Sequence, residues 1–280
     1  MRNSSRIVLF CAFCALFCFL SQTVAAQDFR VFTRVFDESS PVGKPRVVSR
    51  SVSLFHAKKV YDYIDGVGEV CVFSPVERRF TILDGTGQTA TVLTFDELKH
   101  MIELAEEQAL NRADKLAEKE GETAEAVQLL KFLVSPDFKI RVDETSHTLY
   151  LTSSTYSYTV RYVSNVDREF VNAYLDYADW AARLNAVLHP HSLLPAPRLK
   201  LNELLRERGL MPVEISLQVG QQEPLRLRAE HEVRWSFDRG DRSNISHWET
   251  LLNSRSLQLI SFPAYQRRLL LSKTSSPATR

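Results

Sequence analysis

The sequence predicts an α+β fold in which one large, curved antiparallel sheet, shaped like half a barrel, is covered by amphipathic helices. Two β-rich blocks, 28–93 and 138–237, predict the sheet, because apolar and polar residues alternate in them and short turns separate the segments. Long helical patterns begin after Thr94 and Asp167, and their apolar stripes require a sheet to pack against. We therefore expect one α+β domain over 27–272.

The first residues have the three parts of a secretory signal. Residues 1–6 carry two arginines and no acid, 7–20 form an apolar run of 14 residues, and 21–26 are polar or small. A helix of that length covers roughly 21 Å, which is short of a membrane core of about 30 Å. We expect a signal peptide over 1–26, cleaved near Ala26, and a mature protein that is soluble and either secreted or periplasmic.

The composition of the mature chain excludes some classes of partner. Of 35 basic and 34 acidic residues, two arginines and no acid lie in the signal, so the remainder carries a net charge of about −1. This balance gives no long-range attraction to nucleic acid or to an anionic membrane, and no second apolar stretch approaches membrane length. Cys71 is the one cysteine outside the signal, and its apolar surroundings predict a buried, inert thiol.

The first block is expected to be an antiparallel meander. Alternating residues mark its strands at 28–35, 48–54, 59–64, 69–73, 79–83 and 89–93. Two Asp-Gly-x-Gly segments, 65–68 and 84–87, read as hairpin turns whose glycines supply positive φ. A calcium loop needs more oxygen ligands than either turn offers, and a phosphate loop leads into a helix rather than a strand.

The helices and the second block follow in order. Thr94 and Glu97 form a capping box for a helix to about Ala109, followed by a charged extension over 111–122. Further helices are expected at 125–132, 167–188, 197–205 and 245–252. Strands are expected at 138–142, 148–153, 158–162, 213–219 and 225–237. The two halves, 27–134 and 135–272, precede a polar tail over 273–280.

The meander from Ser51 to Leu93, with its short strands 59–64 and 79–83, resembles that of the periplasmic lipoprotein carriers, which are called LolA-like. The resemblance covers topology over about half of the chain and includes no diagnostic motif. It implies that an acyl chain or an amphipathic partner binds on the concave face, without catalysis. The long helices after Thr94 and Asp167 depart from the family pattern and could fill the groove that those carriers keep for lipid.

No motif assigns catalytic residues, a metal or a cofactor. The sequence has no Gly-x-Ser-x-Gly or Ser-x-x-Lys motif. His189 and His191 flank a proline, and the other histidines are scattered without the helical spacing typical of zinc ligands. Aspartates in or beside expected turns are explained by capping and solvation. They are Asp62, Asp65, Asp84, Asp238 and Asp241.

Three residues of the last long strand are candidates to line a ligand site. His231 is on the side of 225–237 that is otherwise apolar, so it is either a hydrogen-bonded core residue or part of a cavity. Trp235 and Phe237 share that side and form either core or pocket wall. We expect an exported envelope protein that binds a lipid, an amphipathic molecule or a protein on the apolar face of the sheet. The alternative is a secreted hydrolase with a dispersed active site.

Overall fold

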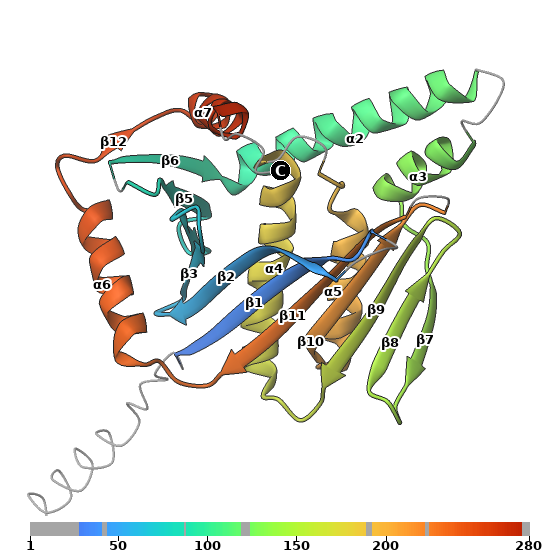
Figure 1. Ribbon diagram of the computed structural model, residues 1–280, viewed down its shortest axis with the longest axis horizontal. Coiled ribbons are helices and arrows are strands. Elements are labelled where there is room, and N and C mark those ends of the chain that lie inside the picture. Colours follow the sequence, from blue (N-terminus) through green and yellow to red (C-terminus); the bar gives the residue numbers. More distant parts are fainter. Residues whose placement is uncertain are drawn as a thin grey trace, which may run out of the picture.

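The computed structural model describes residues 28–40, 44–86, 88–118, 124–188, 192–221 and 224–275, with side chains up to residue 269. Within these ranges, twelve strands form one open, curved sheet in the order β12-β6-β5-β4-β3-β2-β1-β11-β10-β9-β8-β7 (Figure 1). Every neighbouring pair is antiparallel except β12 and β6, which are parallel. The predicted α+β class and curved antiparallel sheet are confirmed.

The first six strands form the predicted meander. They are β1 (Phe29–Asp37), β2 (Arg46–His56), β3 (Lys59–Ile64), β4 (Val70–Ser74), β5 (Arg79–Leu83) and β6 (Thr89–Thr94). A two-residue turn with positive φ at Ala57 and Lys58 joins β2 to β3. The two Asp-Gly-x-Gly turns lie against each other, because a Cβ atom on Gly85 would stand 2.6 Å from the carbonyl oxygen of Val67. Close backbone contact therefore requires glycine there.

The second block joins the first through the pairing of β1 with β11, which links segments almost 200 residues apart in the chain. Its strands are β7 (Lys139–Asp143), β8 (Thr148–Thr152), β9 (Tyr156–Val163), β10 (Met211–Val219) and β11 (Leu225–Arg234). The prediction that β11 reaches residue 237 is wrong. Arg234 already pairs with Arg30 near the start of β1, and the chain then bends so that Asp238 can cap the next helix.

The predicted helices are present, with shifted ends. They are α2 (Phe95–Ala117), α3 (Ala124–Val134), α4 (Arg168–Leu188), α5 (Ala196–Arg208) and α6 (Arg239–Leu252). Thr94 and Glu97 form the expected capping box, and Gly209 ends α5 at a φ of 65°. The sequence did not predict α7 (Phe262–Ser275) or the two-residue strand β12 (Gln258–Leu259), and α7 extends into the segment assigned to a polar tail.

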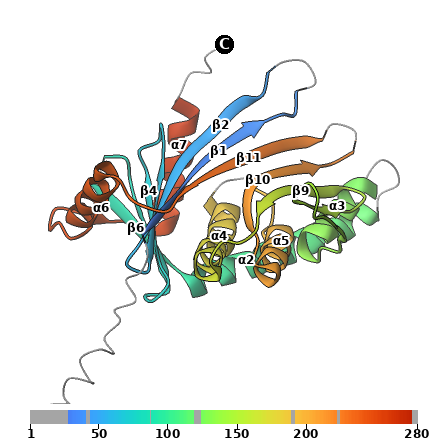
Figure 2. The same ribbon diagram turned by 90° about the horizontal axis from the view of Figure 1, so that it is seen from below.

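The helices lie on both faces of the sheet. We call the face that contacts α4 the inner face; Figure 2 shows α3, α4 and α5 on that side of β1, β11 and β10. Trp248 of α6 lies on the outer face, against Tyr61 and Tyr63 of β3. The described strands and helices therefore pack around two apolar clusters, a large one on the inner face and a smaller one under α6. No helix among the described residues is long and apolar enough to cross a membrane.

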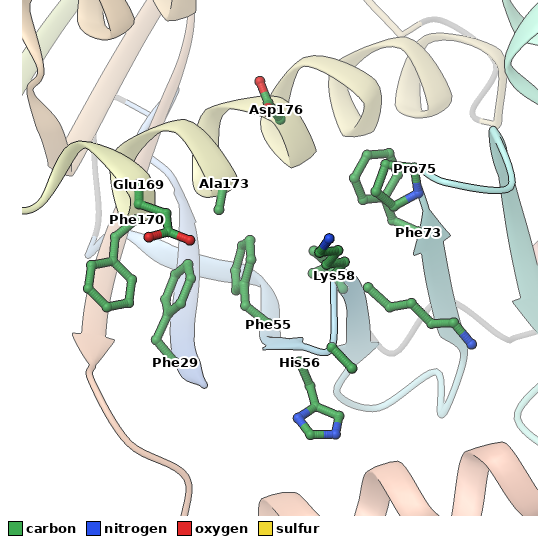
Figure 3. A pocket seen from close by; sticks show the side chains of 13 residues that line it. Phe29, Phe55, His56, Lys58, Phe73, Pro75, Glu169, Phe170, Ala173 and Asp176 are labelled. Carbon is green, nitrogen blue, oxygen red and sulfur yellow. The ribbon is translucent and has the colours of Figure 1, made fainter. Parts of the chain in front are cut away.

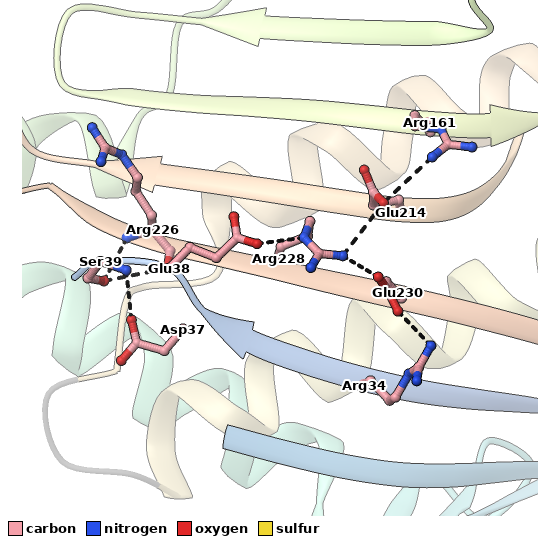
Figure 4. A network of polar contacts seen from close by, with 9 residues as sticks. All are labelled: Arg34, Asp37, Glu38, Ser39, Arg161, Glu214, Arg226, Arg228 and Glu230. Atoms are coloured by element: carbon pink, nitrogen blue, oxygen red, sulfur yellow. Dashed lines mark hydrogen bonds and ion pairs between the residues drawn. The ribbon is translucent and has the colours of Figure 1, made fainter. Parts of the chain in front are cut away.

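The outer face of β1, β11, β10 and β9 is a network of paired charges, as the alternation predicted (Figure 4). The Arg34 guanidinium lies 2.8 Å from the carboxylate of Glu230. Arg228 contacts Glu38 at 2.7 Å, and it also contacts Glu230. Such pairs are partly solvated and contribute about 0–1 kcal/mol each to stability. Their main effect is therefore to fix which side of β11 faces water.

Candidate functional site

An apolar pocket of about 230 Å³ opens where the turn between β2 and β3 approaches the first half of α4 (Figure 3). Its apolar lining comes from four strands and one helix. The principal apolar residues are Phe29, Phe55, Val60, Phe73, Phe170 and Ala173. Figure 3 shows Ala173 on α4 pointing toward the ring of Phe55. The short alanine side chain leaves room between helix and sheet that a larger residue would fill.

Cross-strand pairing builds the aromatic floor of this pocket. Phe29 of β1 and Phe55 of β2 are register partners, so their side chains share the inner face. Their rings stack with centroids 4.0 Å apart and planes at 12°. Phe170 of α4 meets Phe29 edge-on, with centroids 5.2 Å apart and planes at 90°. Aromatic contacts of these kinds add about 0.5–1.5 kcal/mol each to area burial, so the floor is held in place before any ligand arrives.

The rim of the pocket is charged, and most of its charges are already paired. Lys59 donates to Glu249 of α6 at 3.0 Å. Asp176 of α4 accepts from Arg206 of α5 at 3.2 Å. His56 Nδ1 lies 2.7 Å from Asp28 Oδ1. Lys58 and Glu169 also line the pocket and are exposed.

A second group of polar side chains is partly or fully buried beside the pocket, under α4. Ser53 Oγ donates to Asp62 Oδ1 at 2.6 Å across the β2–β3 pair. Burial raises the pKa of Asp62, and hydrogen bonds from Ser53 and Tyr177 partly oppose that rise. The interpretation of Asp62 as a turn residue is therefore wrong, because it lies inside β3. None of these side chains lines the pocket, so we assign the group to packing.

Cys71 is buried, as predicted, on the strand next to Asp62. Burial raises the pKa of its thiol well above the usual value, and the nearby carboxyl groups of Asp62 and Glu69 raise it further. The thiolate is the reactive form of cysteine. Cys71 is therefore held in its unreactive form.

His231 lies under α4, between two hydroxyl groups. Its Nδ1 is 3.0 Å from Thr33 Oγ1, and its Nε2 is 3.5 Å from the Tyr174 hydroxyl oxygen. Burial lowers the pKa of His231 to about 3, and the positive charge of Arg198 contributes to the shift. The imidazole is therefore neutral at pH 7. It has the hydrogen-bonded surroundings of a core histidine and does not line the pocket.

The three candidate residues His231, Trp235 and Phe237 do not form one site in the structure. Trp235 is 48% exposed, so the expectation that it is buried is wrong. Its ring packs against Phe170, with centroids 4.9 Å apart, and so supports the pocket wall from outside. Phe237 lies on the outer face with the cluster around Trp248. Because β11 ends at Arg234, the alternation that grouped these residues stops before Trp235.

Sequence reasoning did not find the pocket residues Phe55, Lys58, Phe170 and Ala173. The sequence shows a two-residue Ala-Lys turn between two alternating segments. It does not show which helix packs over that turn, because tertiary packing decides this. His189 and His191 lie outside the described residues. Elsewhere in the described chain, no three His, Cys, Asp or Glu side chains gather as metal ligands would. No known family model and no curated protein matches this sequence.

Proposed function

We propose that this chain is an exported, non-enzymatic protein of the cell envelope that binds the apolar end of an amphipathic partner in the pocket between β2, β3 and α4. The observation that carries the proposal is the aromatic lining together with the charged rim. An apolar, largely preformed concavity with a few polar groups at its mouth is typical of small-molecule sites. The signal-like first residues support export.

The size of the pocket restricts what can enter. Sites for drug-sized ligands measure about 300–1,000 Å³, whereas this pocket measures about 230 Å³. It therefore suits one aromatic ring or a short aliphatic segment. The helices α4 and α5 pack along the rest of the inner face, including the region under Tyr174. If the chain shares the carriers' way of binding, the ligand enters at this end of the sheet.

The alternative, a hydrolase, has one observation in its favour. His56 at the rim is held by Asp28, as a catalytic base is held by an orienting carboxylate. Among the thirteen side chains that line the pocket, however, none is a serine, threonine, cysteine or tyrosine that His56 could activate. The geometry therefore favours binding. Ester hydrolysis that disappears in a His56→Gln variant would instead support the alternative.

The direct test is to fill the pocket. We expect 2-phenylethanol, a neutral molecule with one ring, to bind with a Kd near 1 mM, about −4 kcal/mol, measured by ligand-observed NMR. Ala173→Leu should weaken this binding at least tenfold, because the longer side chain occupies the same space. Ala126→Leu, the same change at an exposed position of α3, is the matched control and should bind normally. Unchanged binding to Ala173→Leu would refute the proposed site.

A further inference from the structure

Two charges at the mouth of the pocket have opposite signs and come from opposite walls. Lys58 is in the turn between β2 and β3, and Glu169 is in the first turn of α4. Figure 3 shows them on either side of the Phe55 ring. Both side chains line the pocket. Their positions therefore combine a cation, an anion and an aromatic floor in one site.

Among the described residues, the ammonium group of Lys58 has no partner, unlike that of its neighbour Lys59. Lys59, also at the rim, is neutralised by Glu249 of α6 at 3.0 Å. Within the described part of the chain, the Lys58 side chain makes no hydrogen bond or ion pair. The positive φ of 62° at Lys58 belongs to the tight turn, which projects the residue from the end of the hairpin. One uncompensated positive charge thus stands on the strand side of the mouth.

The carboxylate of Glu169 is the negative counterpart. Its backbone N–H donates to Asp167 Oδ1 at 2.9 Å, but its carboxylate has no partner among the described residues. Asp176, two turns further along α4, is paired with Arg206. The unpaired charges at the mouth therefore sum to zero. A ligand with only one charge would satisfy one of them and oppose the other, whereas a zwitterion satisfies both.

We propose, on the basis of the binding function above, that the pocket takes a free α-amino acid with an aromatic side chain. The ring enters the space between Phe55 and Ala173, the α-carboxylate meets Lys58, and the α-ammonium meets Glu169. The volume of about 230 Å³ suits one ring and is too small for the two acyl chains of a phospholipid. A phosphoethanolamine headgroup offers the same pair of charges, so it is the source to be excluded by experiment.

Four ligands with the same ring separate the roles of the charges. They are phenylalanine, phenethylamine, 3-phenylpropionate and 2-phenylethanol. A partly exposed charge pair strengthens binding about two- to fivefold. Phenylalanine can form two such pairs, so its Kd should be about tenfold lower than that of 2-phenylethanol. The Kd of each singly charged ligand should lie within about threefold of the Kd of 2-phenylethanol. Dihexanoyl phosphatidylethanolamine, below its micellar concentration, serves as the lipid headgroup probe.

Two variants assign the charges to residues. Lys58→Gln should weaken the binding of phenylalanine about threefold but should not weaken that of phenethylamine, whose ammonium group the lysine repels. Glu169→Gln should likewise weaken the binding of phenylalanine about threefold but should not weaken that of 3-phenylpropionate, whose carboxylate the glutamate repels. Lys115→Gln, at an exposed position of α2, is the matched control and should change nothing. Because all three positions are exposed, we expect the variants to fold, which thermal melting checks.

The outcomes distinguish this inference from the proposed function. If phenylalanine and 2-phenylethanol bind equally, or if Lys58→Gln and Glu169→Gln do not alter the preference, the zwitterion site is refuted while the apolar pocket stands. If none of the four ligands binds, the proposed function itself fails. If the phosphatidylethanolamine binds and phenylalanine does not, the amino acid assignment is overturned in favour of a lipid headgroup.

Discussion

Acidification should destabilise this protein through His231, which is neutral and partly buried under α4. The imidazole lies between Thr33 and Tyr174, and its pKa falls from 6.5 to about 3 because burial disfavours the charged form. In the unfolded chain the same imidazole titrates near 6.5. Between these two values the unfolded state binds a proton that the folded state does not bind. Stability is therefore complete above about pH 6.5 and is lost as the pH falls toward 3.

The size of the effect follows from that window. Each unit of pH below the unfolded pKa costs about 1.36 kcal/mol until the folded pKa is reached. At pH 5, about 1.5 units below 6.5, His231 alone should reduce the free energy of unfolding by about 2 kcal/mol. A typical domain is stable by about 5–15 kcal/mol, so the loss is easily measured. Arg198 contributes to the shift, and its positive charge makes protonation of the folded state still less favourable.

Urea unfolding at pH 7 and pH 5 measures the effect directly. Wild type and His231→Gln are compared, and His247→Gln at an exposed position of α6 is the control. Because all other titrating groups are common to the proteins, the loss of stability from pH 7 to pH 5 should be about 2 kcal/mol smaller in His231→Gln. His247→Gln should lose as much as wild type. An equal loss in wild type and His231→Gln would show that the imidazole is not held neutral, and the packing of α4 described above would be incorrect.

Two further predictions concern the thiol and the start of the chain. Cys71 should react with a thiol reagent only after unfolding in urea, because it is buried and its pKa is raised; rapid labelling of the native protein, detected by mass spectrometry, would contradict this. N-terminal sequencing of the exported protein should find a start near Gln27, as the signal pattern over 1–26 predicts. Met1 retained on protein extracted from membranes would show that the segment is not cleaved.

The strands were predictable because alternation is a local property. The side chains of β1 and β11 alternate with a period of two, so the sequence alone separates Val31 and Val233 from Arg34 and Glu230. Register is not local. Asp62 lies opposite Ser53 because β2 and β3 turn at Ala57, and that pairing gives a partly buried carboxyl group a hydrogen-bond donor inside a strand.

The ends of elements were less predictable, for a physical reason. In the sequence the alternating pattern continues beyond β11 to Phe237, but a strand needs a partner, and β1 begins at Phe29. Asp238 then starts α6 with a capping box, and this places Phe237 on the opposite face from His231. For α7, the local signal was present, since Phe262 and Tyr265 have helical spacing and are both buried. Tertiary contacts thus ended the strand pattern before Trp235. They also stabilised the helical pattern of α7, which the sequence analysis overlooked.

The pocket depends on the small size of one residue in a helix that otherwise fills its side of the sheet. The broad apolar stripe of α4, which includes Tyr174 and Tyr177, predicted correctly that the helix packs on the sheet. The stripe alone gives no reason to single out Ala173. In the structure, however, its short side chain lies above the stacked Phe29 and Phe55 rings and leaves an open space there. A pattern of apolar residues records which face is buried but not how completely it is filled. Whether the fold contains a binding pocket therefore depends on the side-chain volume at each position together with that of the residue facing it.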